Sequence, residues 1–334
     1  MRRREFITLL GSSAAIWPLA SRAQQATKIA RIGILSLGRG DKSDASLANI
    51  QAFVQALRDL GHVEGQNIAF ERKFADGDVN RLGELAQELV GQPVDAIVAL
   101  ATPPVRAARK ATSTIPIVGI GMADPVEDEV AVSLARPGGN VTGTTFLGPK
   151  LVSRRLQLLK EIVPSLSRVV VLWHPRAYGE RTMAAMLKEI ESAGQSFGTK
   201  LQLVGADSPA DLDGAFAAMT AERADGLMLF PSPMLYSQYS RIVPFAADRR
   251  LPAMYAAREG VELGGLVSYG VNLQDLSRAT APYLDRILKG AKPAELPIQQ
   301  PTKFELVINL KAAKALGVNI GRDFQLIADE VIEE

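Results

Sequence analysis

The sequence predicts an α/β fold in which two Rossmann-like lobes, each a doubly wound parallel sheet, are joined by a hinge. Short β-branched apolar runs alternate with segments of helical spacing, which is the pattern of a parallel sheet covered by helices on both faces. This pattern occurs twice, since the run RIGILS at 31–36 corresponds to RVVVLW at 168–173. The length of 334 residues suits two domains of ordinary size. Two such lobes enclose a cleft, which is where small molecules are most often held.

The first half of the pattern contains four expected strands, at 31–36, around Ile68, at 95–100 and at 115–118. Each is short, apolar and bounded by turn residues. Between them, two segments place apolar residues on one helical face and end at a glycine, which is a common helix stop. These are Phe53, Val54, Leu57 and Leu60 before Gly61, and Leu82, Leu85, Ala86 and Leu89 before Gly91.

The second half repeats the same order, with expected strands at 168–173, around Leu201, at 225–230 and at 251–254. Its helical segments also end at a breaker residue. They contain Leu156, Leu159, Ile162 and Val163 before Pro164, and Met183, Met186, Leu187 and Ile190 before Gly194. Apolar residues at this spacing normally face the core, so we assign them to packing.

Residues 1–23 have the features of an export signal. Arg2–Arg4 supply a positive start, 6–19 supply a short apolar stretch, and Ser21-Arg22-Ala23 offers small residues to a signal peptidase. The order Arg3-Arg4-Glu5-Phe6-Ile7 resembles a twin-arginine signal; an ordinary Sec signal is the alternative. Either route predicts a periplasmic location. The chain has no cysteine, so we expect no lipid anchor, disulfide or thiolate metal site.

The charge balance and the known motifs exclude several functions. Without residues 1–23, 34 basic and 35 acidic side chains remain, which does not indicate a nucleic-acid partner. Two histidines, His62 and His174, are too few for a zinc site. The sequence has no phosphate loop, no dinucleotide fingerprint and no nucleophile elbow. We therefore expect no cofactor, no metal and no enzymatic activity.

Candidate ligand-binding residues follow the carboxyl ends of the expected strands, where open α/β sheets bind their ligands. Hydroxyls can bind a carboxylate, Asp124 can accept bonds from an ammonium group, and aromatic rings can cover an apolar or cationic part. The pattern favours a small zwitterion or carboxylate with an apolar body. The candidates are Ser36, Thr102, Met122 and Asp124 in the first lobe, and Trp173, His174, Ser232, Tyr255 and Tyr269 in the second.

Several of these residues have a structural alternative. Asp124 can cap a helix near Glu127, and Ser36 and Thr102 can act as helix caps. Tyr269 can serve in hinge packing. The sequence alone leaves both interpretations open for each of these residues.

Three blocks of the sequence resemble the tryptophan-binding-like family of ABC transporter substrate-binding proteins. The first contains TIPIV at 114–118, ADPV at 123–126 and SLARPGGNVTG at 133–143. The second is GGLVSYG at 264–270, and the third joins RILKGAKP at 286–293 to QPTKFELVINL at 300–310. They occur in the family's order and spacing, and the resemblance covers essentially the whole chain after the signal.

The resemblance implies a type I periplasmic binding-protein fold, in which two lobes close on a small solute. It also implies a membrane permease as partner, with ATP hydrolysis by a separate subunit. We expect a monomer that delivers an amino acid-like or carboxylate solute; a ligand-sensing module for a membrane receptor is the alternative. The chain departs from many relatives at His174, where they carry Asn, and at Asp128-Glu129, where they carry Gly-Leu.

The repeat and these blocks together predict where the chain passes between the lobes. Residues 28–144 should form lobe 1, completed by 272–300, and residues 145–271 should form lobe 2, completed by 301–334. The hinge should involve Gly143, Thr144, Gly270 and Asn272, because hinge closure usually concentrates in a few residues at such crossings.

Overall fold

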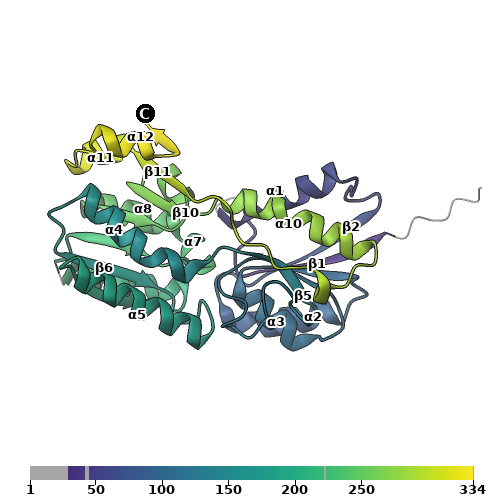
Figure 1. Ribbon diagram of the computed structural model, residues 1–334. Helices are drawn as coiled ribbons and strands as arrows, with labels where there is room; N and C mark the ends of the chain where they lie inside the picture. The colour runs from purple at the N-terminus through teal and green to yellow at the C-terminus, as the bar shows by residue number, and fades with distance from the viewer. Residues whose placement is uncertain (1–28, 42–44, 222, 334) are drawn as a thin grey trace, which may run out of the picture.

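A computed structural model shows two α/β lobes side by side (Figure 1) and describes residues 29–41, 45–221 and 223–333. The predicted export signal lies outside the described residues. The first sheet is entirely parallel, with strand order β2-β1-β3-β4-β5. Its strands are β1 (Ala30–Ser36), β2 (Ile68–Phe74), β3 (Ala96–Leu100), β4 (Ile117–Met122) and β5 (Val141–Thr145).

The first sheet carries helices on both faces. The helices that precede β5 are α1 (Ala45–Asp59), η1 (Val79–Arg81), α2 (Leu82–Val90) and α3 (Thr102–Ala111). A later helix, α10 (Leu273–Leu288), packs against α1 and is followed by η4 (Pro293–Glu295). Phe53 of α1 and Leu284 of α10 share one buried cluster with Ile32 and Ile34 of β1. Burying one such side chain contributes about 1.5–3 kcal/mol to the stability of the folded protein.

The second sheet has strand order β12-β11-β10-β9-β8-β6-β7. All its pairs are parallel except β10 with β11, which are antiparallel. Its strands are β6 (Arg168–Trp173), β7 (Lys200–Gly205), β8 (Gly226–Leu229), β9 (Ala253–Tyr255), β10 (Val267–Gly270), β11 (Glu305–Asn309) and β12 (Glu330–Ile332). The predicted fold class of two parallel-sheet lobes is confirmed.

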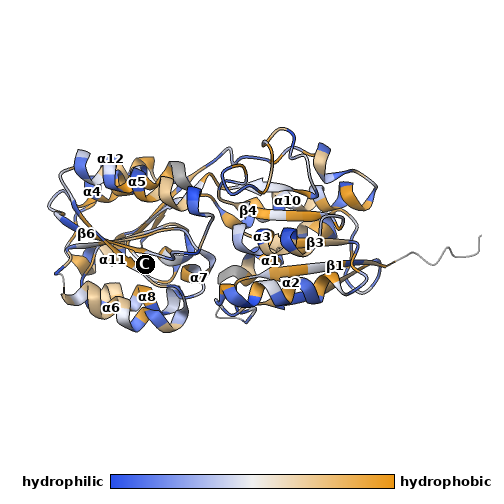
Figure 2. Cartoon of the chain, turned by 90° about the horizontal axis from the view of Figure 1, so that it is seen from below, coloured by the Kyte–Doolittle hydropathy of each residue, from blue (hydrophilic) through white to orange (hydrophobic). Residues whose placement is uncertain are grey.

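Most helices of the second lobe bury one face, whereas η3 (Pro209–Asp211) and α12 (Arg322–Ile327) have no buried residues. Figure 2 shows apolar strands between helices that are apolar on one side and polar on the other, as expected for helices that cover a sheet. They are η2 (Gly148–Leu151), α4 (Val152–Ile162), α5 (Glu180–Ser196), η3 (Pro209–Asp211), α6 (Leu212–Ala221), α7 (Pro233–Tyr236), α8 (Tyr239–Asp248), α9 (Glu259–Glu262), α11 (Leu310–Leu316) and α12 (Arg322–Ile327). Among the described residues, no helix combines the length and apolar character that crossing a membrane requires.

The chain passes between the lobes after β5, after β10 and before β11 (Figure 1). The first and third crossings are hydrogen-bonded to each other: Thr145 N donates to the carbonyl of Gln299 at 2.9 Å, and Gln299 N donates to the carbonyl of Gly143 at 2.9 Å. The predicted hinge residues Gly143 and Thr144 lie in β5, Gly270 ends β10, and Asn272 caps α10. Their role in hinge motion stays a prediction.

The first crossing requires glycine at position 143. Gly143 has φ 131°, and a Cβ atom there would lie 2.0 Å from the carbonyl oxygen of Gly119 in the neighbouring strand. This is a backbone contact, so no side chain can move aside to relieve it. The close approach of β4 and β5 therefore depends on the missing side chain.

Gly143→Ala should lower the Tm by about 6 °C or more, because strain and the clash together cost about 3 kcal/mol or more. Gly61→Ala is the control, since Gly61 also has a positive φ, 92°, with nothing within 4 Å of its Cβ position. This variant should lose only the roughly 1–2 kcal/mol of stability that an alanine in the left-handed conformation costs. Equal Tm losses in calorimetry would contradict the proposed close approach.

Candidate ligand site between the lobes

A cavity between the lobes, which we call the inner chamber, lies at the carboxyl ends of the parallel strands. This is the position at which α/β sheets bind ligands. Its volume is about 60 Å³, enough for several water molecules. It is lined by Ser36, Asn49, Leu100, Ala101, Ile120 and Gly121 from the first lobe, by Phe146, Leu273 and Ser277 near the crossings, and by Tyr178, Pro233 and Tyr236 from the second.

Asn49 is the polar group in the inner chamber with unused bonding capacity. Its side-chain oxygen is buried and has no hydrogen-bond partner, and the residue is 8% exposed. An unpaired buried acceptor costs about 1–3 kcal/mol, so a ligand donor at this oxygen would recover that free energy. The hydroxyls of Ser36 and Ser277 are already bonded, one by Gly38 N at 3.1 Å and the other to the Leu273 carbonyl at 2.8 Å.

Aromatic rings and one helix end supply the rest of the inner chamber. The rings of Phe146 and Tyr178 lie 6.2 Å apart in a tilted arrangement, and the Tyr178 hydroxyl donates to the carbonyl of Pro231. Helix α3 begins directly after Ala101, which has φ 68° and gives the helix no side-chain cap. An uncapped helix start attracts negative charge. The chamber therefore combines an apolar wall, one free acceptor and one site favourable to an anion.

The first-lobe candidates from the sequence lie around this chamber, but only Ser36 lines it. The Thr102 hydroxyl accepts Ala123 N at 2.9 Å, and Met122 is fully buried. The Asp124 carboxylate accepts the backbone N–H groups of Val126 and Glu127, both at 3.1 Å. Asp124 thus caps a turn rather than the expected helix. Ligand contact by Thr102, Met122 and Asp124 stays a prediction.

The second-lobe candidates do not line the inner chamber either. His174 Nδ1 lies 3.1 Å from the hydroxyl of Ser232, which also accepts Leu235 N to cap α7. Tyr255 is fully buried and packs edge-on against Tyr239. The remaining two are half-buried: Trp173 packs against the second-lobe core, and Tyr269 lies beside Phe304 while its carbonyl accepts the Arg155 guanidinium at 2.7 Å. Their contact with a ligand also stays a prediction.

Sequence reasoning missed Asn49, Tyr178 and Tyr236. It considered residues directly after strands, whereas Asn49 lies within α1 and Tyr236 ends α7. One signal was available for Asn49, because it stands four residues before the core residue Phe53 and therefore on the same helical face. A polar residue on an apolar face is the informative exception.

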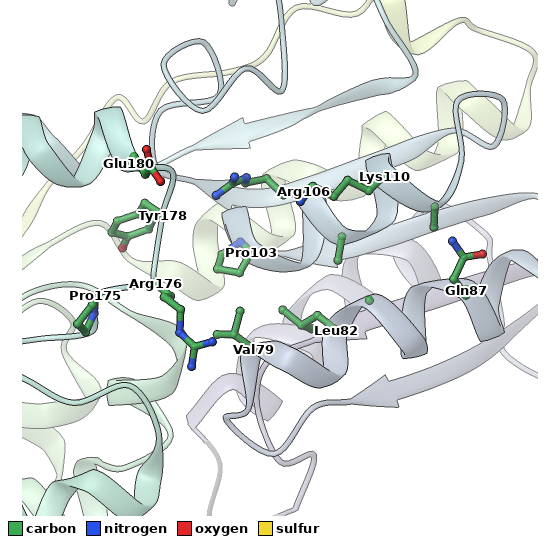
Figure 3. A pocket seen from close by; sticks show the side chains of 13 residues that line it. Val79, Leu82, Gln87, Pro103, Arg106, Lys110, Pro175, Arg176, Tyr178 and Glu180 are labelled. Carbon is green, nitrogen blue, oxygen red and sulfur yellow. The ribbon is translucent and has the colours of Figure 1, made fainter.

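A second cavity, which we call the outer chamber, opens between the lobes beside α3 (Figure 3). Its volume is about 430 Å³. Tyr178 lines both chambers. The outer chamber is lined by Val79, Leu82, Gly83, Gln87, Pro103, Arg106, Ala107, Lys110 and Ala111 from the first lobe, and by Pro175, Arg176, Tyr178 and Glu180 from the second.

Three contacts hold the lobes together at this edge. The buried Asp128 carboxylate, from the loop after β4, accepts Gly179 N at 2.7 Å at the start of α5. Arg176 donates to the Asn80 side chain at 2.7 Å, and Arg181 forms an exposed ion pair with Glu129 at 3.1 Å. Burial raises the pKa of the Asp128 carboxyl, and the hydrogen bond from Gly179 N acts in the opposite direction. Asp128 thus acts as a helix cap supplied by the other lobe.

Two α/β lobes with a cavity between them at the carboxyl ends of the parallel strands are the architecture of two-lobed solute-binding proteins. The family described as "ABC transporter substrate binding protein" matches residues 41–332. The chain belongs to this family.

The comparisons also identify three similar proteins. The chain is 24% identical over 267 residues to a tyrosine-binding protein of Clostridioides difficile, covering 80% of this chain and 75% of that protein. A crystal structure of a conserved domain protein from Vibrio cholerae matches with 30% identity and a TM-score of 0.82, covering 91% of this chain and 100% of the other. A protein from Streptococcus pneumonia in complex with L-Trp matches with 25% identity and a TM-score of 0.81, covering 91% and 99%.

Asp128→Ala should shift the protein toward an open form. A hydrogen bond to a charged group contributes about 1.5–3 kcal/mol, so the closed-to-open ratio should fall about tenfold or more. Small-angle X-ray scattering of the purified protein would show a larger radius of gyration. Asp128→Asn, which keeps an acceptor oxygen, should retain more of the closed form, and Glu129→Ala should change little because exposed ion pairs contribute about 0–1 kcal/mol. Identical scattering from Asp128→Ala and the parent would show that the hydrogen bond between Asp128 and Gly179 does not hold the lobes together.

His174→Asn should reduce the loss in the free energy of unfolding that accompanies a fall in pH from neutral to acid values. Burial lowers the pKa of His174 to about 4, so between pH 6.5 and 4 the unfolded chain binds a proton that the native protein does not. Stability therefore falls as the pH falls through this window, by roughly 3 kcal/mol. Urea unfolding at pH 7 and pH 4.5 should give a smaller difference for the variant.

Glu259→Gln is the matched comparison for this experiment. Burial raises the pKa of Glu259 to about 7, so the native protein holds a proton between pH 4.5 and 7 that the unfolded chain has lost. Its contribution to stability therefore falls as the pH rises, opposite to that of His174. Glu259→Gln should increase the difference between pH 7 and pH 4.5. A His174→Asn variant with the parent's difference would show that His174 is not desolvated.

Proposed function

We propose that this chain is the periplasmic substrate-binding component of an ABC importer and that it binds an aromatic amino acid in the inner chamber. It would deliver this ligand to a membrane permease whose ATPase is a separate subunit, and it would not alter the ligand chemically. The observation that carries the proposal is the buried, unpartnered side-chain oxygen of Asn49, a residue that lines a chamber walled by Phe146, Tyr178 and Tyr236.

The proposed orientation follows from the charges around the chamber. The ligand ammonium group would donate to the Asn49 oxygen, and its carboxylate would lie at the uncapped start of α3 after Ala101. The aromatic side chain would pack among the three rings, where ring contacts contribute about 0.5–1.5 kcal/mol beyond their buried area. The tyrosine-binding relative and the L-Trp complex support this class of ligand.

Closure of the lobes gives this site its mechanism. An aromatic amino acid exceeds the 60 Å³ of the inner chamber, so the lobes must part for it to enter. The ligand then contacts Asn49 on one lobe and Tyr236 on the other, and contacts made to both lobes favour the closed state. A ligand with equal affinity for both states would not shift the equilibrium.

Asn49→Ala should weaken binding of L-tryptophan or L-tyrosine by more than about tenfold, because the ligand ammonium loses its buried acceptor. Isothermal titration calorimetry of both amino acids against parent and variant measures this change. Gln55→Ala on the same helix is the control, since Gln55 is exposed and bonds to Asp59; its dissociation constants should stay within twofold. Absence of binding of both amino acids to the parent protein, or an unchanged Asn49→Ala variant, would contradict the assignment.

A further inference from the structure

We propose that the outer chamber is a second ligand site, which takes a small carboxylate with an aliphatic body. Its walls come from both lobes, and it is separate from the inner chamber. Its volume of about 430 Å³ falls within the range of small-molecule sites. This site does not depend on which amino acid the inner chamber binds.

The chamber has an aliphatic lining. Val79 and Leu82 come from η1 and the start of α2, Pro103 and Ala107 come from α3, and Pro175 approaches from the second lobe (Figure 3). The one aromatic ring among the residues lining it is Tyr178, at the boundary with the inner chamber. An aliphatic chain therefore matches this surface, whereas the rings around the inner chamber match an aromatic one.

Cationic side chains at the edge of this lining indicate that the ligand is an anion. Arg106 and Lys110 stand four residues apart on α3, and both line the chamber (Figure 3). Like charges at this spacing destabilise a helix. Within the described part of the chain, neither forms a hydrogen bond or a contact ion pair, although Arg106 is attracted to the nearby Asp128 carboxylate. A bound carboxylate would offset this destabilisation.

Residues from the second lobe complete the charge distribution. Arg176 contributes a third cation, held in place by Asn80 at 2.7 Å and by Asp207 at 3.3 Å. Glu180 is the one carboxylate among the residues that line the chamber. Because Arg176 is paired with Asp207, the excess positive charge comes from Arg106 and Lys110 against Glu180, and it favours an anionic ligand over a neutral or cationic one.

Tyr178 separates the two chambers. Its ring lines both, and its hydroxyl is committed to the Pro231 carbonyl, so it forms a fixed wall. The free acceptor of the inner chamber, Asn49, and the free cations of the outer chamber, Arg106 and Lys110, lie on opposite sides of this wall. Substitutions on one side should therefore leave binding on the other side intact.

The test is a crossed titration with two probes, hexanoate for the outer chamber and L-tryptophan for the inner one. We expect the parent protein to bind hexanoate saturably at one site in calorimetry, and to bind hexanamide at least tenfold more weakly. Arg106→Gln combined with Lys110→Gln should weaken hexanoate at least tenfold and leave the L-tryptophan affinity within threefold. Lys110→Gln alone should weaken hexanoate severalfold, and raised salt should weaken it in the parent, because exposed cations are screened.

Two variants make the result specific. Arg58→Gln combined with Lys188→Gln removes the same net charge from exposed positions outside both chambers, and it should bind hexanoate like the parent. Asn49→Ala should also bind hexanoate like the parent, whatever its effect on L-tryptophan. The proposal is overturned if the parent does not bind hexanoate, if hexanamide binds equally well, or if Asn49→Ala abolishes hexanoate binding while the Arg106→Gln, Lys110→Gln variant retains it. Failure of L-tryptophan to bind would count against the proposed function alone.

Discussion

The hydrogen bond between the Asp128 carboxylate and Gly179 N fixes how the two lobes meet. It is buried, it joins a loop of one lobe to the first turn of a helix in the other, and it satisfies a backbone donor that α5 leaves unpaired. Both chambers lie between surfaces that this contact brings together. Burial of a carboxylate is costly unless the group is well bonded. Here the amino end of α5 supplies one donor and a favourable dipole, while the second carboxylate oxygen has no hydrogen-bond partner among the described residues.

The crossings between the lobes impose a second constraint. Gly143 allows β5 to approach the backbone of Gly119 more closely than any side chain would permit. On the other side of the hinge, the fully buried Arg155 of α4 donates to the carbonyl of Tyr269 at the end of β10. A buried guanidinium that bonds the end of β10 ties this strand to the second lobe just before the crossing at Gly270 and Asn272, whose role as a hinge stays a prediction.

The two chambers share one wall but differ in chemistry. The inner chamber is aromatic with one free acceptor, Asn49, whereas the outer chamber is aliphatic with free cations, Arg106 and Lys110. Because residues of both lobes line each chamber, an occupant makes its full set of contacts only when the lobes are together as they are here.

The sequence by itself determined the fold class, the duplication and the family, because these depend on periodic burial and on long blocks of local sequence. Ser36, after the first strand, was predicted and lines the inner chamber. Tertiary structure alone decided that Asn49, Tyr178 and Tyr236 meet there, since they lie on a helix, a loop and a helix end far apart in the chain. Asp124, predicted to meet a ligand, caps its own turn, while Asp128 caps a helix of the other lobe. The spacing of apolar residues along the sequence predicts which face of a helix or strand is buried. Which other element covers that face depends on how the lobes pack.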